Sequence, residues 1–314
     1  MGKSSWKVWS ALALQMFAGS AYAGHLYGVV SVDWEGRDLS SRNLSAMKQF
    51  RSEFPEIKLL HFLNAAYYTK EGASSQDVNQ KVSSVIRKGD ELGLHIHAWK
   101  SLFEAAGVSF RSNPTYWGTR LTGCDSDCGH EVALTAYTTD EIRKVVRFST
   151  QILSQNGFGR AKSFRTGGWL GSQAVLDAIA AEGFTLDSSR VPPQFLRAQL
   201  GSLPIFQWIQ DLWGDARSTD QPRSVSTASG PIIELPDNGA LADYMSASQM
   251  VSVYKTYASL VQAHPDVDYY FQIGFHQETA ATYLPQVRQA LRTIESLAAQ
   301  DHVPLTWAEL PMRF

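Results

Sequence analysis

Short apolar runs alternate along this chain with longer segments whose apolar residues recur every three or four positions. The short runs are typical of buried strands and cover residues 26–34, 58–68, 92–99, 161–169, 185–190, 231–237, 268–278 and 304–310. The longer segments are typical of helices with one buried face and cover residues 41–54, 77–90, 138–153, 172–184, 246–263 and 282–299. Thr138 and Glu141 have the spacing of a capping box at the start of one helix.

Repeated strand-then-helix units predict an α/β fold with a parallel sheet, either a barrel or a doubly wound sheet. No glycine-rich phosphate or dinucleotide loop follows the first strand, and no repeat or linker divides the chain. We therefore predict a single barrel-like domain over residues 24–314, with its active site where the strands end. Residues 100–137 and 191–229 lack periodicity and are predicted to be mostly loop.

Residues 1–23 have the pattern of a secretory signal peptide. Two lysines precede a short apolar stretch, and Ala21, Tyr22 and Ala23 fit a cleavage site. A membrane anchor is the alternative, but the stretch is short and interrupted. We expect a secreted or periplasmic protein without a membrane span after cleavage. The net charge of −2 shows no basic excess, so nucleic acid is not indicated as a partner.

The two cysteines, Cys124 and Cys128, lie in the motif "GCDSDCGH". In an exported chain this spacing predicts a disulfide that closes a small loop. A zinc site formed with His130 is the alternative.

Titratable side chains follow the predicted strands at the point where each one ends. A solvated strand end explains any one of them, but five strands share the habit: Asp33, Glu35, His95, His97, Arg165, Asp187, His276 and Glu278. Side chains two positions apart share a face of a strand, so the H-x-H pair of His95 and His97 can chelate one ion. With a carboxylate from the D-x-E pair, they form a zinc-like divalent site with a position left for water.

The motifs resemble those of the polysaccharide deacetylases with a NodB homology domain. "SVDWEG" is similar to the first aspartate motif, and "GDELGLHIHAW" to the histidine motif. "SFRTGGWL", "GFTLDSSRVP" and "FQIGFHQE" resemble the later motifs, in the family's order. The resemblance implies a distorted, incomplete (β/α)7-8 barrel, and it covers most of residues 24–314.

By this resemblance, Asp33 is the general base, Arg165 orients it, and His276 is the general acid. The metal ligands would be His95, His97 and a carboxylate, which is Glu35 or Asp33. Typical members have a second aspartate where this chain has Trp34, and a second histidine where it has Trp99. The D-x-E and H-x-H patterns resemble those of divergent branches, which points to a shifted site.

The sequence thus predicts a secreted hydrolase that uses a divalent ion, with zinc expected, to remove N-acetyl or O-acetyl groups from peptidoglycan or an exported polysaccharide. We expect four residues to bind substrate: Trp99, Trp117, Trp169 and Asp187. Two alternatives remain open. One is an allantoinase-like amidohydrolase acting on a small linear or cyclic amide. The other is a catalytically silent glycan-binding barrel.

Overall fold

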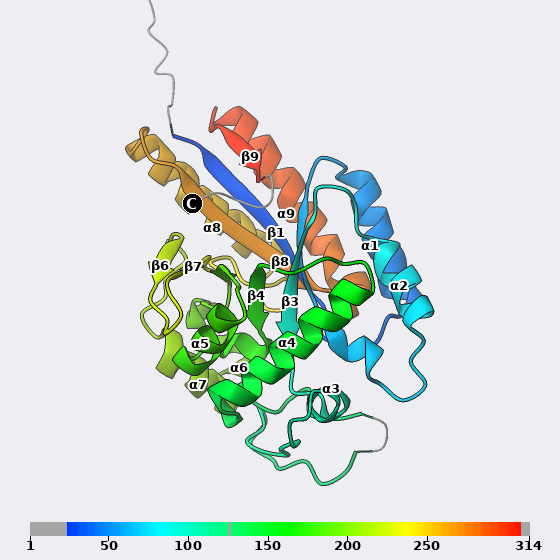
Figure 1. Ribbon diagram of the computed structural model, residues 1–314. Helices are drawn as coiled ribbons and strands as arrows, with labels where there is room; N and C mark the ends of the chain where they lie inside the picture. The colour runs from blue at the N-terminus through cyan, green and yellow to red at the C-terminus, as the bar shows by residue number, and fades with distance from the viewer. Residues whose placement is uncertain (1–23, 125–126, 309–314) are drawn as a thin grey trace, which may run out of the picture.

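The computed structural model describes residues 24–124 and 127–308, which build one curled sheet with helices around it (Figure 1). The described strands run in the order β6-β7-β5-β4-β3-β2-β1-β8. The ninth, β9, pairs with the N-terminal end of β1, ahead of the residues that pair with β2. All neighbours are parallel except β6 and β7. The strands are β1 (Leu26–Asp33), β2 (Leu59–Leu63), β3 (Glu91–Ile96), β4 (Ser163–Thr166), β5 (Leu186–Asp187), β6 (Arg223–Val225), β7 (Ile232–Glu234), β8 (Tyr269–His276) and β9 (Leu305–Trp307).

The helices lie outside the sheet and bury their apolar faces against it and against each other. Neighbouring pairs are α1 with α9, α8 with α9, and α4 with α5. Their bounds are α1 (Ser41–Glu53), α2 (Ser75–Ser83), α3 (Lys100–Ala105), α4 (Thr139–Gln155), α5 (Gln173–Ala181), α6 (Arg197–Leu200), α7 (Pro204–Trp213), α8 (Ala247–Ala263) and α9 (Ala280–Gln300). The capping box of Thr138 and Glu141 is confirmed at the start of α4.

Strand pairing does not close the barrel, because β6 and β8 stand at the two ends of the sheet. An irregular segment after β7 reaches β8 instead. Leu241 bridges to Gly274, whose carbonyl accepts a 2.8 Å hydrogen bond from the amide of Ala242. Gly239 passes so close to β8 that a Cβ there would lie 2.1 Å from the carbonyl oxygen of Gln272. The predicted incomplete barrel is confirmed.

Several elements differ from the prediction. The segment 191–229 holds α6, α7 and β6, so describing it as mostly loop was wrong, whereas the segment 100–137 is mostly irregular outside α3, as predicted. Pro204 opens α7, where a missing N–H costs nothing, and Ile205, Ile209 and Trp213 form its buried face. The helix predicted over 77–90 ends at Ser83, because Asp90 binds the amide of Arg87 and holds the following residues in turns.

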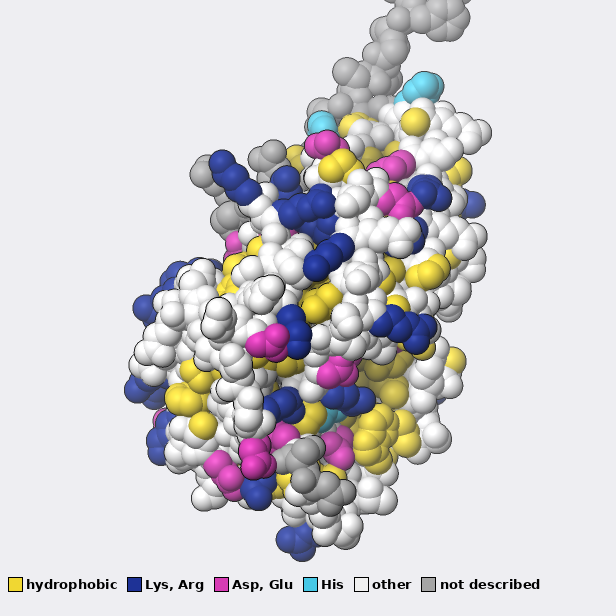
Figure 2. Space-filling model, turned by 90° about the vertical axis from the view of Figure 1, so that its right-hand side faces the viewer, with side chains coloured by type: hydrophobic (Ala, Val, Ile, Leu, Met, Phe, Trp, Pro, Cys, Tyr) yellow, Lys and Arg dark blue, Asp and Glu magenta, His cyan; other side chains and the backbone are white. Residues whose placement is uncertain are grey.

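The disulfide between Cys124 and Cys128 is confirmed. The proposed signal peptide, residues 1–23, lies outside the described residues. Among those described, no helix has both the length and the apolar character needed to cross a bilayer. On the face seen in Figure 2, basic and acidic side chains are interspersed, so this face carries no field of a single sign.

Candidate metal and catalytic site

The register of the parallel strands places four predicted site residues side by side at the carboxyl ends of their strands. Asp33 pairs with His276 across β1 and β8, and His95 pairs with Arg165 across β3 and β4. These strand ends line a pocket together with residues from the loops beyond them. The pocket is lined by Asp33, Glu35, His95, His97, Tyr116, Trp117, His130, Thr166, Gly168, Trp169, Leu200, Ile205, Tyr244 and His276.

Glu35 stands at the centre of the pocket, surrounded by imidazoles. Its Oε1 lies 3.2 Å from Nε2 of His95, and its Oε2 lies 2.8 Å from Nε2 of His97. His130 and His276 approach the same carboxylate, with Nε2 at 2.5 Å from Oε2 and 3.5 Å from Oε1. Burial alone would raise the pKa of Glu35, but the imidazoles of His97 and His276 hold it well below its usual range.

Two of these histidines have the geometry of metal ligands. Nδ1 of His95 lies 2.9 Å from the carbonyl oxygen of Arg165, and Nδ1 of His97 lies 2.7 Å from that of His130. A carbonyl only accepts, so each Nδ1 donates and each Nε2 is the ring nitrogen available to a metal ion. Both Nε2 atoms face the carboxylate of Glu35. Among the described residues, the buried Nε2 of His97 makes no hydrogen bond, although Oε2 of Glu35 lies 2.8 Å away.

This donor set fits a divalent ion. Oxygen and nitrogen atoms lie within 4.8 Å of one another in two overlapping groups, Asp33 with Glu35 and His95, and Glu35 with His97 and His130. Two imidazoles and a carboxylate with a position left open are typical of catalytic zinc.

Asp33 is held by a buried arginine. Nη1 of Arg165 donates to Oδ1 of Asp33 at 2.8 Å, and neither residue is more than 2% exposed. The rest of the guanidinium is also engaged: it donates to the hydroxyl of Ser31 and to the backbone and side-chain oxygens of Ser188. The predicted pairing of Arg165 with Asp33 is therefore present.

His276 is held by a carboxylate that the sequence did not single out. Its Nδ1 lies 3.0 Å from Oδ2 of Asp243, and the hydroxyl of Thr279 fixes the other oxygen of Asp243 at 2.7 Å. Burial lowers the pKa of His276, but Asp243 and Glu35 outweigh it and raise that pKa to about 10. The pair therefore keeps a proton on the imidazole.

The backbone that carries Glu35 is also fixed. Glu278 accepts hydrogen bonds from the amides of Glu35 and Arg37 at 3.1 and 3.2 Å, and from the hydroxyl of Tyr67. The indole of Trp99 donates to the carbonyl of Glu35 at 2.8 Å. Burial and the nearby Glu35 raise the pKa of Glu278 to about 7.

Trp34 points to the opposite side of β1, as the strand parity predicts. It is fully buried, and its Nε1 donates to Nδ1 of His61 at 3.1 Å. His61 lies 3.4 Å from the carboxylate of Asp90, which also forms a buried ion pair with Arg51. His61 is therefore the core histidine that an apolar strand suggests, and Trp34 takes no part in the pocket.

The four predicted substrate residues fall into two pairs. Trp117 and Trp169 line the pocket, with Trp117 47% exposed at its edge. Trp99 is buried behind Glu35, and Asp187 is buried beside Glu234, where it accepts a hydrogen bond from Ser189. Neither Trp99 nor Asp187 lines the pocket, so their contact with substrate stays a prediction.

Several residues in the pocket or directly behind its lining were not predicted to belong to the site. His130 was expected only beside the cysteines, and the structure places it against Glu35. Asp243 and Tyr244 follow β7 at a distance in the chain where no periodicity or motif marks them. Asp237 accepts hydrogen bonds from Trp169 and Gln272 and lies 3.7 Å from Arg165.

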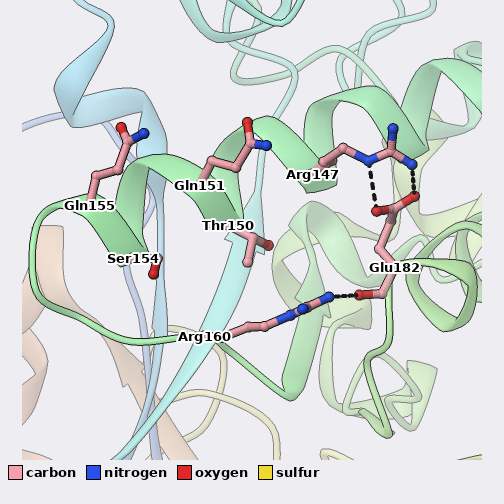
Figure 3. A pocket seen from close by; sticks show the side chains of 7 residues that line it. All are labelled: Arg147, Thr150, Gln151, Ser154, Gln155, Arg160 and Glu182. Carbon is pink, nitrogen blue, oxygen red and sulfur yellow. Dashed lines mark hydrogen bonds and ion pairs between the residues drawn. The ribbon is translucent and has the colours of Figure 1, made fainter.

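A larger hollow lies on the outer side of α4, but its arginines are already bound to Glu182. Figure 3 shows Arg147 paired with the carboxylate of Glu182 and Arg160 bound to the carbonyl of the same residue. Its volume is about 420 Å³ against about 70 Å³ for the pocket around Glu35. The arginines are exposed and already paired, so we place the candidate site in the smaller pocket.

Comparison with known proteins defines the class of fold. No protein-family model and no curated protein matches the chain. A solved structure from Mycobacterium smegmatis, classed as a polysaccharide deacetylase, has 12% identity and a TM-score of 0.51, covering 93% of this chain and 96% of that one. The expected resemblance to polysaccharide deacetylases is confirmed at the level of the fold. Puue allantoinase is equally similar, with 12% identity, a TM-score of 0.50, and coverage of 93% and 89%.

Proposed function

We propose that this protein is a metal-dependent hydrolase that removes acetyl groups from the amide nitrogens of a carbohydrate polymer. One observation carries the proposal. A carboxylate held by a buried arginine and an imidazole held by a carboxylate meet at two overlapping donor groups for a divalent ion, which share Glu35. That arrangement supplies a base, an acid and a Lewis-acid position within one pocket.

The residues divide the reaction between them. A divalent ion, with zinc favoured by the ligand types, polarises a carbonyl and lowers the pKa of a water when bound. Arg165 engages Oδ1 of Asp33, which leaves Oδ2 to accept the proton of the attacking water. His276, kept protonated by Asp243, donates its proton to the departing nitrogen. Glu35, His95 and His97 would hold the ion.

The size of the pocket supports a small acyl group. Its volume is small, about 70 Å³, so we assign the acetyl group to the pocket and the sugar ring to its edge. Trp117 is the large exposed aromatic at the edge, where a sugar face can pack against it. We assign the polymer, either peptidoglycan or an exported polysaccharide, to this outer position.

An amidohydrolase acting on a small cyclic amide is the second candidate. The similarity to Puue allantoinase supports it, because the two fold matches have nearly equal TM-scores and a shared fold does not determine the substrate. A silent glycan-binding barrel is disfavoured, since binding alone requires neither Asp33 with Arg165 nor His276 with Asp243. The disulfide supports the further proposal that the protein is exported, because such bonds persist in oxidising compartments.

A substrate panel tests the proposal. Acetate release is measured from acetylated chitooligosaccharides and from peptidoglycan, and ring opening from allantoin, with chelator and after zinc is restored. We expect zinc-dependent acetate release that is lost in Glu35→Gln. Turnover of allantoin alone would favour the second candidate. Undiminished acetate release after complete metal removal would refute the metal-dependent reaction.

A further inference from the structure

His130 differs from the two ligand histidines in the proton that it presents to Glu35. Nη2 of Arg37 lies 3.3 Å from its Nδ1. A guanidinium is always protonated and only donates, so this Nδ1 must be the acceptor. The proton of a neutral His130 is then on Nε2, which lies 2.5 Å from Oε2 of Glu35. If Nε2 bound a metal, the proton would move to Nδ1 and face the guanidinium, donor against donor.

His130 is also packed as a fixed part of the pocket wall. Its ring stacks on that of His97, with centroids 4.0 Å apart and an interplanar angle of 12°. Its carbonyl oxygen receives the Nδ1 proton of His97 at 2.7 Å. One residue thus sets the tautomer of a ligand histidine through its backbone and contacts the carboxylate ligand through its side chain.

The chain before His130 is anchored where the ligand strand β3 passes into α3. We call this the disulfide loop, meaning Cys124, Asp127, Cys128, Gly129 and His130. The carboxylate of Asp127 binds the amide and hydroxyl of Ser101 at 3.0 and 2.7 Å and Nζ of Lys70 at 3.1 Å. The carbonyl of Cys128 accepts from the amide of Lys100 at 2.7 Å.

Gly129 connects this anchor to His130. Its φ is +100°, and a Cβ would lie 2.3 Å from the carbonyl oxygen of Ala98. Only glycine tolerates both the conformation and the close approach. Gly129 therefore fixes the backbone conformation between Cys128 and His130. The disulfide of Cys124 and Cys128 restrains the chain directly before Gly129.

We propose that the disulfide loop is a structural part of the metal centre, and that His130 is a positioning residue whose Nε2–H orients Glu35 for metal binding. The inference rests on the metal-dependent function proposed above. It predicts that metal affinity depends on a disulfide that itself touches no ligand. Hydrogen-bond partners of metal ligands typically change affinity by about 10- to 100-fold when removed.

Metal binding without substrate tests this inference separately from the reaction. Zinc affinity is measured by competition with a chromophoric chelator, and the ligand set is followed by the visible absorption of bound Co²⁺. The variants are His130→Ala, His130→Gln, and Cys124→Ser with Cys128→Ser. His264→Ala removes an exposed imidazole at the end of α8 and is the matched control. Circular dichroism establishes that each variant is folded.

We expect His130→Ala to weaken zinc binding by about 10- to 100-fold and to leave the Co²⁺ spectrum in place. His130→Gln, which keeps an N–H donor, recovers most of the affinity. The double serine variant loses affinity too, and its combination with His130→Ala loses less than the two effects added together.

Three results would overturn the inference. They are unchanged affinity in His130→Ala, a Co²⁺ spectrum showing a lost nitrogen ligand, or full affinity in the double serine variant. If the unaltered protein binds no metal at all, the proposed function fails and this inference fails with it. If it binds metal and the variants match His264→Ala, only the inference fails.

Discussion

Replacing Arg165 by methionine removes the buried cation that pairs with Asp33. The guanidinium is fully buried and donates to Asp33 at 2.8 Å, to Ser31 at 3.1 Å and twice to Ser188 at 2.9 Å. It also lies 4.5 Å above the ring of Phe62. Methionine fills part of the volume and replaces none of these bonds, so Asp33 is left as a buried charge without its partner.

The cost of breaking a buried ion pair in this way is about 3–5 kcal/mol. That is a large part of the roughly 5–15 kcal/mol by which a domain is stable. Urea unfolding of chelator-treated protein, followed by circular dichroism, measures the loss without interference from bound metal. We expect a lower midpoint with the slope m unchanged, since the surface exposed on unfolding stays the same.

Two further variants test whether the buried pair of Arg165 and Asp33 stabilises the protein. Arg217→Met changes an exposed arginine and should lie within about 0.5 kcal/mol of the unaltered protein. Asp33→Asn combined with Arg165→Met should cost less than the sum of the single changes, because residue 33 then carries no charge that has lost its partner. If Arg165→Met were no more destabilising than Arg217→Met, the buried pair would not have the energetic role assigned here.

Three further predictions concern the acid, the core and the pocket edge. His276→Gln should lower kcat for acetate release by about 10²- to 10⁴-fold with zinc content unchanged, and loss of zinc in this variant would contradict the assignment. Burial raises the pKa of Asp90, but His61 and the amides of Leu59 and Arg87 outweigh it and lower that pKa from 3.8 to about 2. The resulting stability, about 2 kcal/mol, is fully present above pH 4 and is lost as pH falls through 2. The melting temperature of Asp90→Asn should therefore lack this acid-dependent drop, and an equal drop in both proteins would count against the shift. Trp117→Ala should raise KM for a polymer several-fold and leave a small acetylated substrate unaffected, whereas equal changes for both substrates would place Trp117 in the catalytic pocket itself.

The sequence predicted the sheet well because its strands are buried on both faces and read as apolar runs. It predicted α6 and α7 poorly, since a short helix gives too few turns for periodicity to be recognised. The limits of α2 depended on Asp90, which binds the amides of Leu59 and Arg87. Contacts between residues distant in the chain decide such boundaries, and a local pattern does not contain them.

The residues of the candidate site were likewise predicted only in part from the sequence. Asp33, His95, Arg165 and His276 were found because parallel strands bring their carboxyl ends to one edge, so position in the strand implies position in space. His130 reaches the pocket only because its loop is anchored on α3. Asp243 is brought in by the segment that completes the sheet beside β8. The ring centroid of Trp99 lies 5.4 Å from that of His130, and its buried indole donates to the carbonyl of Glu35.

The position of Trp34 leads to the last prediction. Typical polysaccharide deacetylases, which this sequence resembles, carry a carboxylate directly after the aspartate. Here residue 34 faces the core beside His61, and residue 35 faces the pocket. Trp34→Asp combined with Glu35→Gln introduces the adjacent aspartates of typical polysaccharide deacetylases, yet it should bind no zinc in the chelator competition, because neighbouring residues at a strand end point to opposite sides. Trp34→Phe is the control and should keep normal affinity, since it keeps an aromatic ring on the core side and leaves Glu35 unchanged. Tight zinc binding by the double variant would show that β1 can turn its side chains over, and the assignment of Glu35 as the ligand would then be wrong.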